Sequence, residues 1–363
     1  MDKLGLISIQ KRCLCHLSLI FNIERSFSLK NPIRIDHLLM RLIFGRRWRD
    51  KLWITKKDKA EIVGRIAMAS AKVLTDVYDL KPIKIATVGK NPSVNPGLLQ
   101  TDTGYLMIAR SSRLRCYNDV DYIENKAGID DINYLYTLDK EFQVISHSAL
   151  DETLLREKGY CIRHCMSDSR LFYWNEQVWA IGAALRLKDG KEIVSQIMYR
   201  IEGAVVVDAI AFDSPTQDIH EKNWTPVLKE GVLRFIYSYL PPNILRVDGR
   251  DIVLEGPLRK IQGHDARGGT PLVEYANGYL CLVHQAPNMW NGKRSYTHSF
   301  VYFSKDLELL EVSEPFYLQR RGLEFAAGIA KVDGGIVVSY GVADRACMVL
   351  QIPDRVMQRY LML

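Results

Sequence analysis

The sequence predicts an all-β protein, a five-bladed β-propeller preceded by a short N-terminal helical segment. Two observations predict this fold. A turn-and-strand unit recurs five times after Pro82, and helical periodicity is confined to the residues before it. The copies start several tens of residues apart, which is enough chain for one four-stranded blade each. We therefore expect two domains, a basic helical segment over residues 1–81 and the propeller over residues 82–363.

Each repeat begins with a turn that contains Gly or a polar pair, and it continues as a strand with alternating large apolar residues. The five copies are Asp102–Arg110, Asn175–Gly182, Lys229–Tyr237, Ala276–His284 and Val332–Tyr340. Other strand-like runs, such as Gln196–Tyr199, lie between them. Repeated strands at this spacing, with no helices between them, favour a propeller over a β-sandwich.

The N-terminal segment contains two predicted helices. A capping box over Thr55–Asp58, with Asp in place of Glu, opens a run in which apolar residues recur every three or four positions as far as Asp79. A second helix is expected over Asp36–Leu52, where leucines alternate with arginines. This basic face fits either a surface helix docked on the main domain or a contact with an anionic membrane or a protein partner.

The bulk composition narrows the functional classes. The formal net charge of the 363 residues is +7, and much of it lies between Arg41 and Lys59, which argues against nucleic acid as the ligand of the whole chain. Seven cysteines without regular spacing indicate reduced thiols. Cys161 and Cys165 flank His164, but no second ligand pair follows, so no metal is expected. No membrane span or signal peptide is evident, and we expect a cytoplasmic protein.

A short polar cluster accompanies each predicted blade. The clusters are Asn91–Pro96, Ser167–Arg170, Glu221–Pro226, Arg267–Pro271 and Glu324–Gly328, and the last repeat closes on Tyr340–Arg345. Taken singly, each has an ordinary structural explanation, since Asn-Pro and Gly-Gly-Thr-Pro are common turns. A propeller gathers equivalent loops around a central channel, so residues far apart in sequence meet at one mouth. Their shared place in the repeat therefore predicts one shared site.

The ordered set of clusters resembles glycoside hydrolase family 130, the β-mannoside phosphorylases and their hydrolytic relatives, over roughly Lys84–Pro353. The family's motifs are similar to the following segments in chain order: Asn95-Pro96 with the strand ending at Arg110, Ser167–Arg170 with Ser in place of the family's Glu, Lys222-Asn223, Gly268–His284, and Tyr340–Asp344. The ordered set is fairly specific, whereas no single motif is.

The resemblance implies a five-bladed propeller that cleaves or transfers a glycosyl unit with inversion, on a manno-configured or related sugar. Asp168 would be the catalytic acid, donating its proton through a sugar hydroxyl while a nucleophile attacks the opposite face. The implied substrate-binding residues are Asn95, Arg110, Arg170, Lys222, Asn223, Trp224, His284, Tyr340 and Asp344. Among these, the Asn95 and Asp344 side chains would hold sugar hydroxyls, and the cationic side chains would stabilise an anionic nucleophile or donor phosphate.

Two departures from the family bear on the nucleophile. Val283 precedes His284, whereas the phosphorylases carry further basic and Tyr phosphate ligands. Leu228 stands near the position of an expected phosphate-binding Lys, with Lys229 beside it. Hydrolysis, phosphorolysis and transfer from an activated sugar therefore all stay open. No resident cofactor is expected, and inorganic phosphate or a nucleotide sugar are the candidate co-substrates.

Two other functional classes compete with an enzyme. The chain could be a non-catalytic sugar-binding propeller, or a scaffold that binds protein partners through the basic helices and the propeller rim. A scaffold would not need Asp168, Asn223 and Asp344 at matching places in the repeat, which favours the enzyme. An oligosaccharide or sugar is the expected partner in the first two cases, and the oligomeric state is open.

Overall fold

The computed structural model describes residues 70–89, 91–112, 115–117, 121–123, 131–162, 164–259, 266–286 and 295–362. The helix expected over Asp36–Leu52 lies outside these residues, as does the start of the helix expected from Thr55. The end of the helix expected from Thr55 to Asp79 is described, and there the expectation is wrong in part. Lys72–Val73 forms strand β1, which pairs in parallel with β22 (Phe316–Tyr317), and helix α4 occupies only Leu74–Tyr78.

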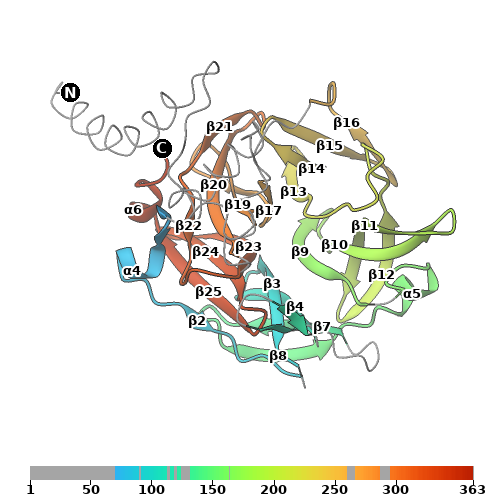
Figure 1. Cartoon of the computed structure of the whole chain (residues 1–363), viewed down its shortest axis with the longest axis horizontal. Helices are drawn as coiled ribbons and strands as arrows, with labels where there is room; N and C mark the ends of the chain where they lie inside the picture. The colour runs from blue at the N-terminus through green and yellow to red at the C-terminus, as the bar shows by residue number, and fades with distance from the viewer. Residues whose placement is uncertain are drawn as a thin grey trace, which may run out of the picture. The chain divides into compact units, whose positions relative to one another are not determined.

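Nearly all the described secondary structure is β-strand, arranged in sheets around a common centre (Figure 1). The first sheet contains β3 (Ser93–Gln100), β4 (Tyr105–Ser111), β7 (Ile132–Leu138) and β8 (Val144–Ala149). The second contains β9 (Ser167–Trp174), β10 (Gln177–Lys188), β11 (Lys191–Glu202) and β12 (Val205–Ala211). The third contains β13 (Thr225–Lys229), β14 (Val232–Tyr239), β15 (Pro242–Asp248) and β16 (Asp251–Leu254).

The two remaining large sheets each include a strand from the start of the described chain. One contains β23 (Glu324–Val332), β24 (Gly335–Val342) and β25 (Ala346–Pro353), with β2 (Ile83–Lys84) on its outer edge. The other has seven strands: β17 (Arg267–Gly268), β18 (Val273–Tyr275), β19 (Gly278–Gln285), β20 (Thr297–Ser304), β21 (Leu309–Val312), β22 and β1. These pairings join the beginning of the described chain to its end. The short elements are the hairpin of β5 (Arg115–Tyr117) and β6 (Asp121–Ile123), helix α5 (Thr153–Glu157) and helix α6 (Asp354–Met357).

The prediction of an all-β propeller arrangement is confirmed. Each of the predicted repeats supplies the second strand of a different sheet, namely β4, β10, β14, β19 and β24. Neighbouring sheets touch in sequence: β3 contacts β9 and β23, β9 contacts β13, β14 contacts β17, and β19 contacts β23. The expected count of five four-stranded blades is wrong, because among the described residues only four sheets have that form. In the seven-stranded sheet both β17 and β18 pair with β19, and β1 and β22 are added at the other edge.

The hydrophobic core lies between adjacent sheets, and it explains why the repeats are readable in the sequence. Strand β24 is buried at all of its positions, and β19 at all but its last residue. A strand that packs against neighbours on both faces is apolar on both faces, so it appears as a continuous apolar run bounded by turns. In the described residues, no helix is both long and apolar enough to cross a membrane.

Close approach of the inner strands β3, β9, β13, β17 and β23 requires glycine at particular positions. A Cβ on Gly97 of β3 would overlap the backbone carbonyl oxygen of Ser169 in β9, and a Cβ on Gly268 of β17 would overlap that of Asn223. These contacts fix how the inner strands lie beside one another. We call the end of the sheets at which the inner strands begin the front end, and the end at which they finish the rear end.

Candidate active site at the front end of the sheets

Three predicted site residues share an unusual backbone conformation at the front end. Asn95, Asp168 and Asn223 have left-handed φ angles of 50°, 54° and 66°. Each lies near the start of an inner strand, and the pairing of β3 and of β9 with their neighbours is irregular at these points. Asn and Asp tolerate this conformation better than most residues, and bulges of this kind re-aim side chains. Strained backbone of this type clusters at functional sites.

Asn95 and Asp168 meet across the first and second sheets. The Asn95 Nδ2 atom donates a hydrogen bond of 2.7 Å to the Asp168 Oδ1 atom. The Asn95 Oδ1 atom is buried and accepts no hydrogen bond from any residue that the structure describes. A buried acceptor left without a donor costs about 1–3 kcal/mol. A ligand hydroxyl at this position would satisfy it, so the amide is suited to holding a polar ligand beside Asp168.

Arg110 provides a positive charge next to this pair. Its Nη1 atom donates to the Ser167 Oγ atom at 2.7 Å, while its buried Nε atom has no acceptor in the described part of the chain. Burial works against the charge of Arg110, but the carboxylates of Asp168, Asp131 and Asp344 favour it and raise the pKa of the guanidinium. Arg110 therefore stays charged within electrostatic reach of three carboxylates.

Asp131 is a member of this group that the sequence reasoning missed. It is buried directly before β7, accepts a hydrogen bond of 3.1 Å from the Ser112 Oγ atom, and lies 4.0 Å from the His164 Nδ1 atom. Asp131 belongs to no cluster before an inner strand, so the only signal in the sequence is a lone acid ahead of an apolar strand. Among the described residues, no group of three or more His, Cys, Asp or Glu side chains could hold a metal ion.

Arg170 has a different place from the one expected. Its buried guanidinium donates to the carbonyl oxygens of Gly269 (2.6 Å), Asp168 (2.6 Å) and Gly268 (3.1 Å), and to the Asn223 Oδ1 atom (2.9 Å). Burial lowers the pKa of Arg170, and Asp168 opposes this shift. Because protein acceptors occupy its donors, the geometry gives Arg170 a structural role, joining three sheets, in place of the expected anion contact.

Lys222 and Arg267 add positive charge to the front end between the third and seven-stranded sheets. Both side chains are exposed. Burial lowers the pKa of His220, and the positive charges of Lys222 and Arg267 lower it further. Neither forms an ion pair with a described residue. Asn223, next to Lys222, is buried with its Oδ1 atom bound to Arg170. The structure thus keeps Lys222 available to a ligand and uses the Asn223 oxygen within the protein.

His284 is the next-to-last residue of β19, at the front end, and it is buried. Its ring stacks on Tyr296, with centroids 5.5 Å apart, and meets the edge of Phe325 at 4.8 Å. Its Nδ1 atom has no hydrogen-bond partner among the residues that are described. Burial, with the nearby His298 and the cationic arginines, holds the pKa of His284 well below its usual range. It is therefore a neutral imidazole that could donate or accept one hydrogen bond, and it is not a cation.

Two predicted sugar contacts are corrected by the structure. Trp224 is fully buried against Phe212 and Phe235, and its Nε1 atom donates to the Glu221 Oε2 atom at 2.9 Å. Tyr340 is fully buried in β24, where its hydroxyl donates to the Gln319 Oε1 atom at 2.6 Å. Both aromatic side chains serve the core, because the spaces between sheets demand large apolar groups.

Asp344 lies in the front-end turn between β24 and β25, together with Ala343. Residues 343–345 connect the paired residues Val342 and Ala346, and positive φ angles of 47° at Asp344 and 51° at Ala343 are usual in a tight hairpin turn, so the backbone of Asp344 needs no functional explanation. Its carboxylate is half-exposed and acts electrostatically on Arg110. The front end thus brings together Asn95, Arg110, Asp168 and Asp344, with Arg170 linking this group to Asn223.

Comparison with known proteins finds solved structures with a similar fold but no match in sequence. No family model matches the sequence, and no curated protein matches it. Among solved structures, one belongs to glycoside hydrolase family 130, described as mannoside phosphorylases that contain hydrolases targeting β-1,2 mannosidic linkages in Candida mannan. It is 11% identical, covers 73% of this chain and 85% of its own, and has a TM-score of 0.53.

Two further solved structures come from Leishmania mexicana. A GDP-Man-dependent mannosyltransferase is 11% identical with a TM-score of 0.51, covering 75% of this chain and 89% of its own. A mannose phosphorylase in complex with phosphate ion is 11% identical with a TM-score of 0.51, covering 82% and 96%. At this identity the likeness shows the fold alone. The resemblance to family 130 that the motifs predicted is confirmed at that level.

Proposed function

We propose that this chain is a carbohydrate-active enzyme that cleaves or transfers a glycosyl unit with inversion, with Asp168 as the general acid. The observation that carries the proposal is the hydrogen bond between Asn95 and Asp168, beside the unpartnered Asn95 Oδ1 and Arg110 Nε atoms. Buried polar groups without protein partners can be satisfied by the hydroxyl groups of a sugar, which can both donate and accept hydrogen bonds. The solved neighbours described as mannoside enzymes support the same substrate class.

The two carboxyl oxygens of Asp168 have different roles in the proposed reaction. The Oδ1 atom accepts the Asn95 hydrogen bond, which leaves the Oδ2 atom to carry the proton. That proton passes to the departing glycosidic oxygen, directly or through a sugar hydroxyl, as the bond from this oxygen to the anomeric carbon breaks. The nucleophile forms its bond to the anomeric carbon from the opposite face, which inverts the configuration. The Asn95 Oδ1 atom accepts a sugar hydroxyl and positions the ring.

The positive charges at the front end favour an anionic co-substrate. Arg110 remains charged beside Asp168, and Lys222 and Arg267 are exposed cations without an ion pair among the described residues. Inorganic phosphate as nucleophile, or a nucleotide sugar as donor, would be stabilised by this field. Hydrolysis by water uses the same acid and needs no such cations. The second candidate function, a non-catalytic sugar-binding propeller, uses the same polar groups without turnover.

The test compares wild type with Asp168→Asn on a panel of β-mannosides, with and without inorganic phosphate. The amide keeps the size and hydrogen bonding of the carboxyl but removes the transferable proton, so turnover should fall about 10²–10⁴-fold. Calorimetric binding of the same sugars should persist. Asp306→Asn is the matched control, because Asp306 is an exposed carboxylate paired with Lys229 at 2.8 Å.

Three results separate the candidates. Near-normal turnover in Asp168→Asn rejects this residue as the acid. Sugar binding without turnover in both proteins favours the binding-module function. Proton NMR of the first product reports its anomeric configuration, and a retained configuration would reject the inverting mechanism.

A further inference from the structure

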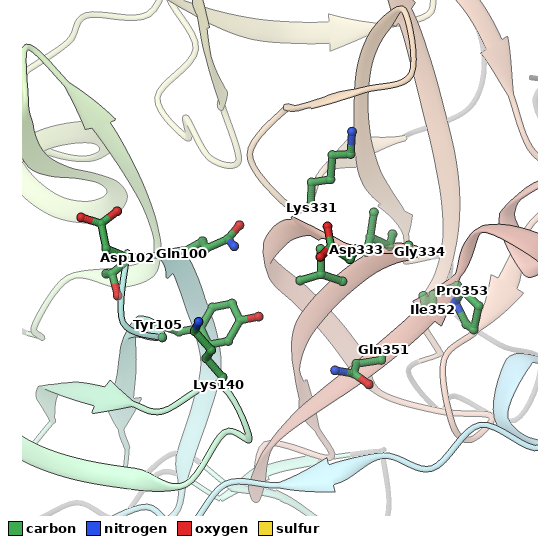
Figure 2. Close-up of a pocket in the computed structure, with 15 residues that line it drawn as sticks. Gln100, Asp102, Tyr105, Lys140, Lys331, Asp333, Gly334, Gln351, Ile352 and Pro353 are labelled. Carbon is green, nitrogen blue, oxygen red and sulfur yellow. The ribbon is translucent and has the colours of Figure 1, made fainter.

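A hollow of about 890 Å³ opens at the rear end, between the first sheet and the sheet of β23–β25 (Figure 2). It is lined from one side by residues of the β3–β4 and β7–β8 turns, and from the other by residues of the β23–β24 turn and the end of β25. Its polar members include Gln100, Asp102, Lys140, Lys331, Asp333 and Gln351. In Figure 2 the two groups face each other across the gap.

The hollow is separate from the candidate active site. Asn95 and Gln100 both lie on β3, one near its start and the other at its end. Five residues of strand span about 16 Å at roughly 3.3 Å per residue. On β23, Glu324 at the front end and Lys331 at the rear end are further apart still. A ligand in the hollow would therefore not contact Asp168 unless it were a long chain.

The charges of the lining side chains balance. Two lysines, Lys140 and Lys331, lie with two aspartates, Asp102 and Asp333, and none of the four forms an ion pair with a described residue. Lys331 has its Nζ atom 5.9 Å from the centroid of the Tyr275 ring. An equal number of cations and anions disfavours a strongly charged ligand. The lining residues Ile336 and Ile352 are buried, which disfavours an apolar ligand.

The remaining polar groups suit a ligand with many hydroxyls. The Gln100 and Gln351 amides offer both donors and acceptors, and neither is hydrogen-bonded to a described residue. Tyr105 is buried, with its ring stacked on Phe142 at a centroid distance of 4.8 Å, so its hydroxyl is held in one place. In Figure 2 this hydroxyl points across the gap toward the opposite wall.

We propose that the rear-end hollow is a second carbohydrate-binding site, which holds a neutral oligosaccharide and performs no chemistry. Its volume lies within the range of about 300–1,000 Å³ that is usual for small-ligand sites. Its walls are strand ends and tight turns, which makes the site preformed. The choice of a sugar among neutral polar ligands rests on the proposed function, whereas the charge balance and the geometry do not.

The test counts binding events with manno-oligosaccharides by titration calorimetry. Wild type should bind at two sites, and the double variant Asp333→Ala, Gln351→Ala should weaken one of them at least about tenfold while turnover of short substrates stays unchanged. Both side chains are exposed, so the fold should survive. The matched control is Glu157→Ala, Lys158→Ala, which alters exposed residues at the end of helix α5.

The outcomes distinguish this proposal from the proposed function. Two binding events in Asp168→Asn, one of which is lost on adding the rear-end double variant, support the hollow even if no turnover is found in any protein. A single event that the rear-end variant leaves unchanged overturns it. Binding of inorganic phosphate that disappears in Lys140→Ala also overturns it, because the hollow would then be an anion site.

Discussion

Replacing Arg170 by Met tests whether this residue joins the sheets or binds the ligand. The side chain is fully buried and makes four hydrogen bonds to protein acceptors. Met fills a similar volume without any donor, so three carbonyl oxygens and the Asn223 Oδ1 atom would lose their partner. Burying the guanidinium charge has a cost, which also lowers the pKa of Arg170. Removing the side chain relieves this cost.

The net loss can be bounded from these terms. Each buried acceptor left without a donor costs about 1–3 kcal/mol, and breaking a buried charged network typically costs about 3–5 kcal/mol. We therefore expect Arg170→Met to lower the free energy of unfolding by about 3–5 kcal/mol. Arg170→Lys keeps the charge but replaces only part of the hydrogen bonds, so its loss should be smaller.

The assay is denaturation in guanidinium chloride followed by Trp fluorescence. Arg250→Met is the control, because the side chain of Arg250 is 58% exposed and its ion pair with Asp208 is at the surface. Such a pair contributes about 1 kcal/mol or less. A loss below about 1 kcal/mol for Arg170→Met would refute the structural role. Unchanged stability with weakened sugar or phosphate binding would restore the role in ligand binding that the sequence predicted.

Three further predictions concern packing and pH. Gly97→Ala should lower the free energy of unfolding by at least about 2 kcal/mol, because the added methyl group would overlap the Ser169 carbonyl oxygen. If denaturation shows the variant to be as stable as wild type, the close approach of the two strands is contradicted. Burial raises the pKa of Glu324 from 4.5 to about 7, although three backbone N–H groups oppose the shift. The folded protein therefore keeps this proton to a higher pH than the unfolded chain does, and the stability of wild type falls as pH rises between these values. Glu324→Gln does not titrate, so its stability deficit relative to wild type should shrink by about 1–3 kcal/mol between about pH 5 and about pH 8. A deficit that grows with pH would contradict this prediction. Burial lowers the pKa of His298 from 6.5 to about 3, so the stability of wild type falls as pH drops below 6.5. The free energy of unfolding of His298→Gln, measured over the same pH range, should depend less on pH below 6.5 than that of wild type.

The repeats were predictable because their information is local. The second strand of each large sheet is bounded by tight turns and packs between neighbours, so the turn and the apolar run stand next to each other in the sequence. The polar residues at the front end were predictable for a similar reason. Asn95 and Asp168 occupy equivalent places at the starts of inner strands, where an irregular backbone needs Asn or Asp.

The features that the sequence did not reveal depend on distant partners. The carbonyl oxygen of Gly268 lies 98 residues from Arg170 along the chain, and nothing near Arg170 indicates that its donors are already used. Strand β1 pairs with β22 near the other end of the chain, so the seven-stranded sheet could not be counted from local pattern. Trp224 was predicted among the substrate-binding residues because it stands in a polar cluster, whereas its contacts are aromatic residues such as Phe212 and Phe235.

A crystal structure of the protein soaked with mannose and inorganic phosphate tests the central claim most directly. The account predicts a sugar at the front end, with one hydroxyl donating to the Asn95 Oδ1 atom and another within hydrogen-bond distance of the Asp168 carboxyl group, and phosphate near Arg110. Sugar found only in the rear-end hollow or on the outer surface, with the Asn95 Oδ1 atom still unpartnered, would contradict it.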